Sequence, residues 1–67
     1  MISNKVKEYR TQRNMTQVEL AKMVGASSRT IISIEAQKYN PTLELAFKIA
    51  LALNTTVVEL FEYKEEK

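Results

Sequence analysis

The chain has 67 residues, which is enough for one domain over residues 1–67, and folding buries only about 60% of the surface of a chain this short. It contains no Cys and no His, so it lacks the side chains that form disulfides, thiolate nucleophiles and most zinc sites. No apolar run approaches the roughly 20 residues of a membrane span, and the N-terminus has no signal-peptide core.

These absences argue against catalysis. A Ser or Thr nucleophile would need a Lys or Glu as its base, and no such pair can be identified in the sequence. We therefore expect a soluble, cytoplasmic protein that is not an enzyme and uses no metal, cofactor, small-molecule ligand or membrane.

The positive charges are concentrated in the first 40 residues. This part carries seven Lys and Arg against three Glu, whereas residues 41–67 carry three Lys against five Glu. A basic half beside an acidic half suits a molecule that turns one side toward a polyanion, but a mixed, solvated surface explains the same counts. Charge alone does not decide between the two.

Apolar residues recur at helical spacing, and capping residues divide the chain into five short helices. Ser3 or Asn4 can cap a first helix that ends at about Arg13, with Val6 and Tyr9 facing inward. Together with a single Gly and a single Pro, this pattern predicts an all-α fold.

A second helix is predicted over about residues 17–24. Thr16 stands three residues before Glu19, which is the spacing of a capping box, where each side chain accepts the other residue's backbone N–H. Gly25 follows at the point where a helix commonly ends with a left-handed residue.

A third helix over about residues 28–36 begins after Ser27, which can serve as its N-cap. The two helices and their glycine-containing turn have the lengths of a helix-turn-helix motif over about residues 17–36, although a generic αα-corner looks the same on these grounds. Arg29 is the one long cation among small outward side chains, so this helix is slim enough to enter a DNA major groove.

The link after the third helix is expected to be extended, because the residue before Pro41 disfavours the helical region. Thr42 can cap a fourth helix over about residues 43–53, and Asn54 can end it in a left-handed conformation.

Thr56 and Glu59 repeat the capping-box spacing and predict a short fifth helix. Its apolar residues are Val57, Leu60 and Phe61. The charged tail after it is either disordered or a short strand, and Phe61 and Tyr63 are candidates to pair with the Ile2 region in a two-stranded ribbon.

Several segments keep the spacing of a known family, and they are Thr16–Ala21, Val24–Ser27, Thr30-Ile31, Ile34-Glu35 and Lys38–Leu43. They resemble the Cro and lambda-repressor type of helix-turn-helix regulator, also called the XRE family, and the resemblance covers about residues 4–61. It implies a five-helix DNA-binding domain that usually acts as a dimer on a roughly palindromic operator. The chain departs from the family at Ala36-Gln37, where Asn-Gly is usual, and at Ile32, where a polar residue is common.

The resemblance places the base-reading residues on the third helix. Arg29 is the main candidate, because a guanidinium can bind guanine O6 and N7 together, and a phosphate contact or a solvated surface is its alternative. Ile32 can contact a thymine methyl group or pack within its own protein. Ser27, Ser28 and Ser33 complete the set.

Phosphate contacts are expected where the family binds the DNA backbone. Gln17 matches the family's phosphate-binding position at the amino end of the second helix, where backbone N–H groups also point outward. The other expected phosphate contacts are Thr16, Thr30, Lys38, Asn40 and Thr42.

Two further features follow from the resemblance and the helix faces. Arg10 and Glu35 match a family ion pair that joins the first and third helices. Phe47 and Leu51 lie off the inward face of the fourth helix, which suggests a contact with a second copy. The expected dimer residues are Leu51, Asn54, Thr55, Val57 and Leu60.

The sequence thus favours a sequence-specific transcriptional regulator, a homodimeric repressor that binds a palindromic double-stranded DNA operator. The alternative is a protein-binding module of the same fold, either an adaptor or the antitoxin of a toxin–antitoxin pair.

Overall fold

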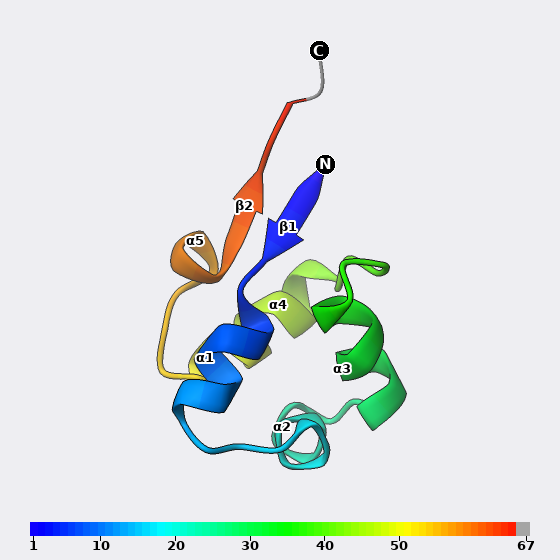
Figure 1. The fold of residues 1–67 in the computed structure, drawn as a ribbon, viewed down its shortest axis with the longest axis vertical. Coiled ribbons are helices and arrows are strands. Elements are labelled where there is room, and N and C mark those ends of the chain that lie inside the picture. The colour runs from blue at the N-terminus through cyan, green and yellow to red at the C-terminus, as the bar shows by residue number, and fades with distance from the viewer. Residues whose placement is uncertain (66–67) are drawn as a thin grey trace.

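Five helices and one short antiparallel ribbon form the part of the chain that the computed structural model describes, residues 1–65 (Figure 1). In chain order these elements are β1 (Ile2–Asn4), α1 (Val6–Gln12), α2 (Gln17–Val24), α3 (Ser28–Glu35), α4 (Leu43–Ala52), α5 (Val57–Leu60) and β2 (Phe61–Tyr63). The predicted mostly helical fold is confirmed. No helix in this part of the chain has the length and apolar character needed to cross a membrane.

Side-chain caps begin four of the helices at the residues that the sequence indicated. The hydroxyl oxygens of Thr16, Ser27, Thr42 and Thr56 each accept the backbone N–H three residues ahead. The capping box at Thr16 is complete, because the Glu19 carboxylate accepts the Thr16 N–H at 2.8 Å. This hydrogen bond from the Thr16 backbone N–H favours the charged carboxylate and lowers the pKa of Glu19.

The second predicted capping box is incomplete. Glu59 Oε1 lies 3.3 Å from the hydroxyl of Thr56, and it does not accept the Thr56 N–H. Helix α5 also ends earlier than expected, because Phe61 has an extended backbone with φ −121° and ψ 146° and begins β2. Phe61 is therefore a strand residue, and the prediction that the fifth helix carries it is wrong.

The first helix starts with help from Asn4. Its Oδ1 accepts the Val6 N–H at 3.1 Å. Lys5 is the residue that directly precedes the helix and its side chain forms no cap, so the residue before it, Asn4, supplies one instead. The pairing of the ribbon is also as predicted, with Ile2 opposite Tyr63 and Asn4 opposite Phe61. The ribbon projects from one end of the helices (Figure 1), and the molecule is therefore elongated, about 37 × 21 × 20 Å.

Helices α1 to α4 end in the same way. A left-handed residue follows each of them, and these residues are Asn14, Gly25, Gln37 and Asn54, with φ between 54° and 70°. In each case the next residue donates its N–H to a carbonyl five positions back, as Lys38 does to Ser33 at 3.0 Å. This motif satisfies carbonyls that the end of a helix leaves without partners.

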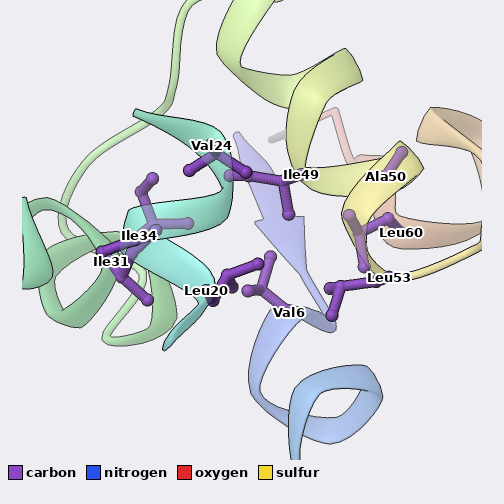
Figure 2. Close-up of a cluster of buried hydrophobic side chains, with 10 residues drawn as sticks. Val6, Leu20, Val24, Ile31, Ile34, Ile49, Ala50, Leu53 and Leu60 are labelled. Atoms are coloured by element: carbon purple, nitrogen blue, oxygen red, sulfur yellow. The ribbon is translucent and has the colours of Figure 1, made fainter. Parts of the chain in front are cut away.

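The core is formed by apolar side chains from all five helices (Figure 2). Its largest fully buried side chains are Val6, Leu20, Ile31, Ile34, Ile49, Leu53 and Leu60. Ile31 and Ile34 of α3 belong to this core, whereas Ile32 is 48% exposed, so α3 is fixed by its inner face and its opposite face is left to solvent.

A buried ion pair joins α1 to α3. Arg10 Nε donates to Glu35 Oε2 at 2.6 Å and Arg10 Nη2 donates to Glu35 Oε1 at 3.1 Å, so the predicted pair is present and bidentate. Arg10 Nη1 also donates to the carbonyl of Met15 at 2.7 Å, in the segment between α1 and α2. The two charged side chains are only 10% and 4% exposed.

Gly25 tests the helix-ending motif. Gly25→Ala should lower the free energy of unfolding by about 1 kcal/mol, because a left-handed backbone is unfavourable for a residue with a Cβ. No atom lies within 4 Å of that Cβ, so the cost is conformational and Gly25→Asn should recover part of it. Urea unfolding measures the difference, and an Asn variant less stable than the Ala variant would contradict this explanation.

The ion pair is tested by removing one charge at a time. Arg10→Met or Glu35→Gln leaves the remaining group buried without its full set of partners, which typically costs about 3–5 kcal/mol. Arg13→Met is the control, since Arg13 is exposed and contacts its own helix through the carbonyl and ring of Tyr9. Thermal unfolding should separate the first two variants from the third, and equal melting temperatures for all three would refute a structural role.

Candidate nucleic-acid interface

The outer face of α3 carries the predicted base-reading residues. Arg29 and Ile32 are exposed, whereas Ser28 and Ser33 are half-buried at its sides. Ser27 precedes the helix, and its hydroxyl both caps the Thr30 N–H and lies 3.0 Å from the Thr30 hydroxyl. The structure therefore places these candidates on one exposed helix and its amino end.

A shallow hollow runs between α3 and the segment that follows it. Its lining residues are Ser27, Arg29, Thr30, Ser33, Lys38 and Tyr39. Two cations and three hydroxyl-bearing side chains of the predicted set thus border one concavity, and none of the described residues that line it is acidic. This composition suits a phosphate backbone, which accepts hydrogen bonds from hydroxyl groups and is attracted to Lys and Arg.

Tyr39 was missed by the sequence reasoning. It is exposed, and its phenol lines the same hollow as Arg29 and Lys38. A phenolic hydroxyl can donate to a phosphate oxygen, so Tyr39 joins the candidate contacts. Its position in the sequence does point to a phosphate contact, because it stands between Lys38 and Asn40, two residues predicted to bind phosphate.

Gln17 has a different contact from the one expected. Its Nε2 donates to Glu35 Oε1 at 3.0 Å, so the side chain is half-buried and tied to the ion pair. The capping box uses the backbone N–H groups of Thr16 and Glu19. Among residues 1–65, those of Gln17 and Val18 have no protein acceptor, since the first N–H groups of a helix have no preceding turn to donate to. The amino end of α2 can therefore bind an anion through its backbone.

The remaining phosphate candidates lie at the start of α2 and in the segment between α3 and α4. Lys38, Asn40 and Thr42 are exposed, and the Thr42 hydroxyl accepts the Leu45 N–H at 3.2 Å as the cap of α4. The Thr16 hydroxyl accepts the Glu19 N–H at 3.0 Å. Because a hydroxyl that accepts a bond still has a proton to donate, both threonines remain able to bind a phosphate oxygen.

The predicted dimer residues do not share one environment. Leu51 is 77% exposed and Asn54 is also exposed, whereas Thr55 and Val57 are half-buried. Leu60 is fully buried in the core, so it has no surface to offer a second copy, and its assignment to the dimer contact is wrong. Val58 has the exposure that Leu60 lacks, 87%, and the sequence reasoning overlooked it.

Helix α4 presents a stripe of apolar residues to solvent. Leu43, Phe47 and Leu51 follow one another at intervals of four and are all exposed. Such a stripe on a small domain is a candidate surface for association. In the described part of the chain, no group of three His, Cys, Asp or Glu side chains is arranged to hold a metal ion.

Known proteins show the same sequence pattern. A family model described as helix-turn-helix matches residues 6–60. An uncharacterized HTH-type transcriptional regulator from Archaeoglobus fulgidus is 48% identical over 63 residues, which cover 94% of this chain and 89% of the relative. Another, from Methanocaldococcus jannaschii, is 46% identical over 66 residues, which cover 98% of this chain and 100% of the relative.

Solved structures show the same fold. A Bacteroides fragilis protein proposed to bind DNA has a TM-score of 0.84 at 29% identity, with 92% of this chain and 100% of that chain covered. SinR of Bacillus subtilis, a regulator of biofilm formation crystallised with DNA, has a TM-score of 0.71 at 28% identity, with 78% and 84% covered. SinR in complex with the SinI protein has a TM-score of 0.73, with 78% and 52% covered.

The family model spans most of the chain. The two archaeal relatives match this chain over nearly their whole length. The helix-turn-helix arrangement of α2 and α3, with Arg29 on the exposed face of α3, agrees with both comparisons. The chain belongs to the XRE-type helix-turn-helix family of DNA-binding transcriptional regulators.

Proposed function

We propose that this regulator acts as a single helix-turn-helix domain that binds a palindromic operator as a homodimer and represses transcription by occupying it. The observation that carries the proposal is the hollow beside α3, where Arg29 and Lys38 meet hydroxyl-bearing side chains and where, among residues 1–65, no acidic side chain takes part. Its work is binding and not catalysis, and its place is the cytoplasm, where its DNA lies.

Helix α3 enters the major groove in this proposal. Arg29 reads a guanine, Ile32 contacts a thymine methyl group, and the serines at positions 27, 28 and 33 contact base edges or phosphates at short range. The backbone is held on both sides of α3. The phosphate contacts are Thr16, the amino end of α2 at Gln17, Thr30, Lys38, Tyr39, Asn40 and Thr42.

Two copies are needed because one recognition helix reads too few base pairs to select a site. Two-fold symmetry places the two α3 helices in successive major grooves, about 34 Å apart. We assign the contact between copies to the carboxyl end of α4 and the segment that follows, through Leu51, Asn54, Thr55 and Val57, with Val58 added. The exposure of Leu51 and Val58 supports this assignment, because apolar side chains gain most from being covered.

A protein-binding role is the second candidate. The exposed stripe of Leu43, Phe47 and Leu51 on α4 favours it, and SinR is an example of a related fold that forms a complex with another protein. An adaptor would bind its protein partner without selecting a DNA sequence. Selection of bound sequences from a random DNA pool separates the two functions, since only a sequence-specific regulator enriches one motif.

The base-reading and phosphate assignments predict different losses. Arg29→Ala should relax preference at one base pair per half-site, at a cost of about 1–3 kcal/mol for the preferred operator only. Lys38→Ala should weaken operator and random DNA alike and make the plot of log K against log[salt] shallower by about one unit. Fluorescence anisotropy on the two DNAs over a salt series measures both effects.

Lys64→Ala is the matched control for these variants. It removes the same charge from the residue after β2, at the far end of the ribbon from α3 (Figure 1), and should bind both DNAs like the wild type. If Arg29→Ala weakens operator and random DNA to the same extent, the assignment of base reading to Arg29 is wrong.

The dimer assignment is tested with Leu51→Glu. The change places two like charges in an isologous contact, so the variant should sediment as a monomer, keep its helical circular dichroism and lose operator binding. Leu43→Glu is the control, because Leu43 is 71% exposed on the same helix but lies outside the assigned contact. A dimeric Leu51→Glu variant, or a wild type that is monomeric at the concentrations where it binds its operator, would contradict the assignment.

A further inference from the structure

The carboxyl end of α3 is bonded to the first strand through two side-chain amides. The Gln37 carboxamide accepts the Asn4 N–H at 3.1 Å and donates to the Asn4 carbonyl at 3.1 Å, so it pairs with β1 as a peptide group of a neighbouring strand would. Asn4 Nδ2 donates to the Ile34 carbonyl at 2.9 Å and lies 3.3 Å from Gln37 Oε1. We call this set of contacts the Asn4–Gln37 clasp.

The clasp uses an edge of β1 that β2 leaves open. In an antiparallel pair, residues alternately direct their N–H and C=O groups toward the partner strand and away from it. Asn4 faces Phe61 in the register, while the next residue, Lys5, donates its N–H to the Leu60 carbonyl at 2.9 Å. The backbone groups of Asn4 therefore point outward, and Gln37 occupies them.

Gln37 also stands out among the residues that end helices. Of the four left-handed residues after α1 to α4, it alone is neither Gly nor Asn, the two types that adopt this conformation most readily. Within residues 1–65, neither Asn14 nor Asn54 forms a side-chain hydrogen bond, whereas the Gln37 side chain forms several. The bonds to Asn4 offset the conformational cost of a longer side chain at this position.

The clasp fixes the chain where α3 ends and the next segment begins. Ile31 and Ile34 anchor α3 in the core, and its last residue, Glu35, is held by Arg10 and Gln17. After Glu35 the chain leaves the core, and exposed residues follow as far as Asn40. Contacts to base edges need side chains placed within a fraction of an ångström, so motion at this end of α3 would disturb the base contact expected of Ser33.

We propose that Asn4 and Gln37 are positioning residues for DNA recognition, which hold the carboxyl end of α3 against the terminal ribbon so that specific binding depends on β1. The proposal rests on the assignment of α3 as the base-reading helix. Neither residue contacts DNA in it. Both act through the placement of α3 and of the segment after it.

Gln37→Gly and Asn4→Ser test the clasp without unfolding the protein. Glycine suits the left-handed backbone at position 37 and removes only the carboxamide. The melting temperature of Gln37→Gly should therefore stay close to that of the wild type, so that unfolding does not explain a loss of binding. Serine at position 4 keeps an oxygen that can accept the Val6 N–H and removes the Nδ2 donor. Asn14→Gly is the matched control, because it makes the same backbone change at φ 54° with no clasp to break.

The readout is the ratio of affinities for the selected operator and for random DNA, measured by fluorescence anisotropy, together with hydrogen exchange of the Gln37 and Lys38 amides. Both clasp variants should lower operator affinity about three- to tenfold, leave random DNA within about twofold and speed exchange at these amides. The double variant should lose less affinity than the product of the two single losses, since both changes remove the contact between Asn4 Nδ2 and Gln37 Oε1. Asn14→Gly should match the wild type.

Two results would overturn the proposal. Clasp variants that bind the operator like the wild type, while Arg29→Ala relaxes specificity, show that α3 reads bases without help from the clasp. Equal losses on operator and random DNA show that the clasp affects general affinity and not readout. A wild type with no preference for any sequence, or an Arg29→Ala variant that keeps full preference, would instead refute the proposed function of α3.

Discussion

The carboxylate of Glu35 sets the relative placement of three helices. It accepts two bonds from Arg10 of α1 and one from Gln17 of α2, and it belongs to α3 itself. Arg10 extends the network to the backbone of the segment between α1 and α2. Because desolvation offsets much of the attraction in a buried ion pair, the contribution of this network is mainly one of orientation. The outer face of α3 and the amino end of α2 are thereby held in one arrangement, which a surface that follows a DNA backbone requires.

The sequence predicted well those parts of the fold that depend on short-range chemistry. Thr16, Ser27 and Thr42 begin their helices because a hydroxyl oxygen can reach an N–H three residues ahead. Gly25 and Asn54 end helices because these types adopt a left-handed backbone easily. Each of these rules involves residues within one turn, so the sequence contains all the information needed.

The errors concern contacts between distant parts of the chain. Leu60 looks like the other apolar residues after α4, and its burial depends on how α5 docks on the core. The same limit applies to Gln17, whose partner Glu35 is 18 residues away, and to Gln37, whose partner Asn4 is 33 residues away. Spacing along the chain shows that a carboxamide is available, but which group it meets is decided by the tertiary fold.

The ribbon has a consequence for the order in which the protein matures during synthesis. β1 is made first and β2 last among the described elements, and their pairing extends to the Met1 nitrogen, which donates to the Lys64 carbonyl at 2.6 Å. At about 5–20 residues per second, α1 to α3 are synthesised about one to five seconds before β2, the partner strand of β1. Closing a loop of nearly the whole chain is also the entropically most demanding pairing in the fold. A nascent chain can thus contain β1 and its first helices and still lack β2, the strand that pairs with β1.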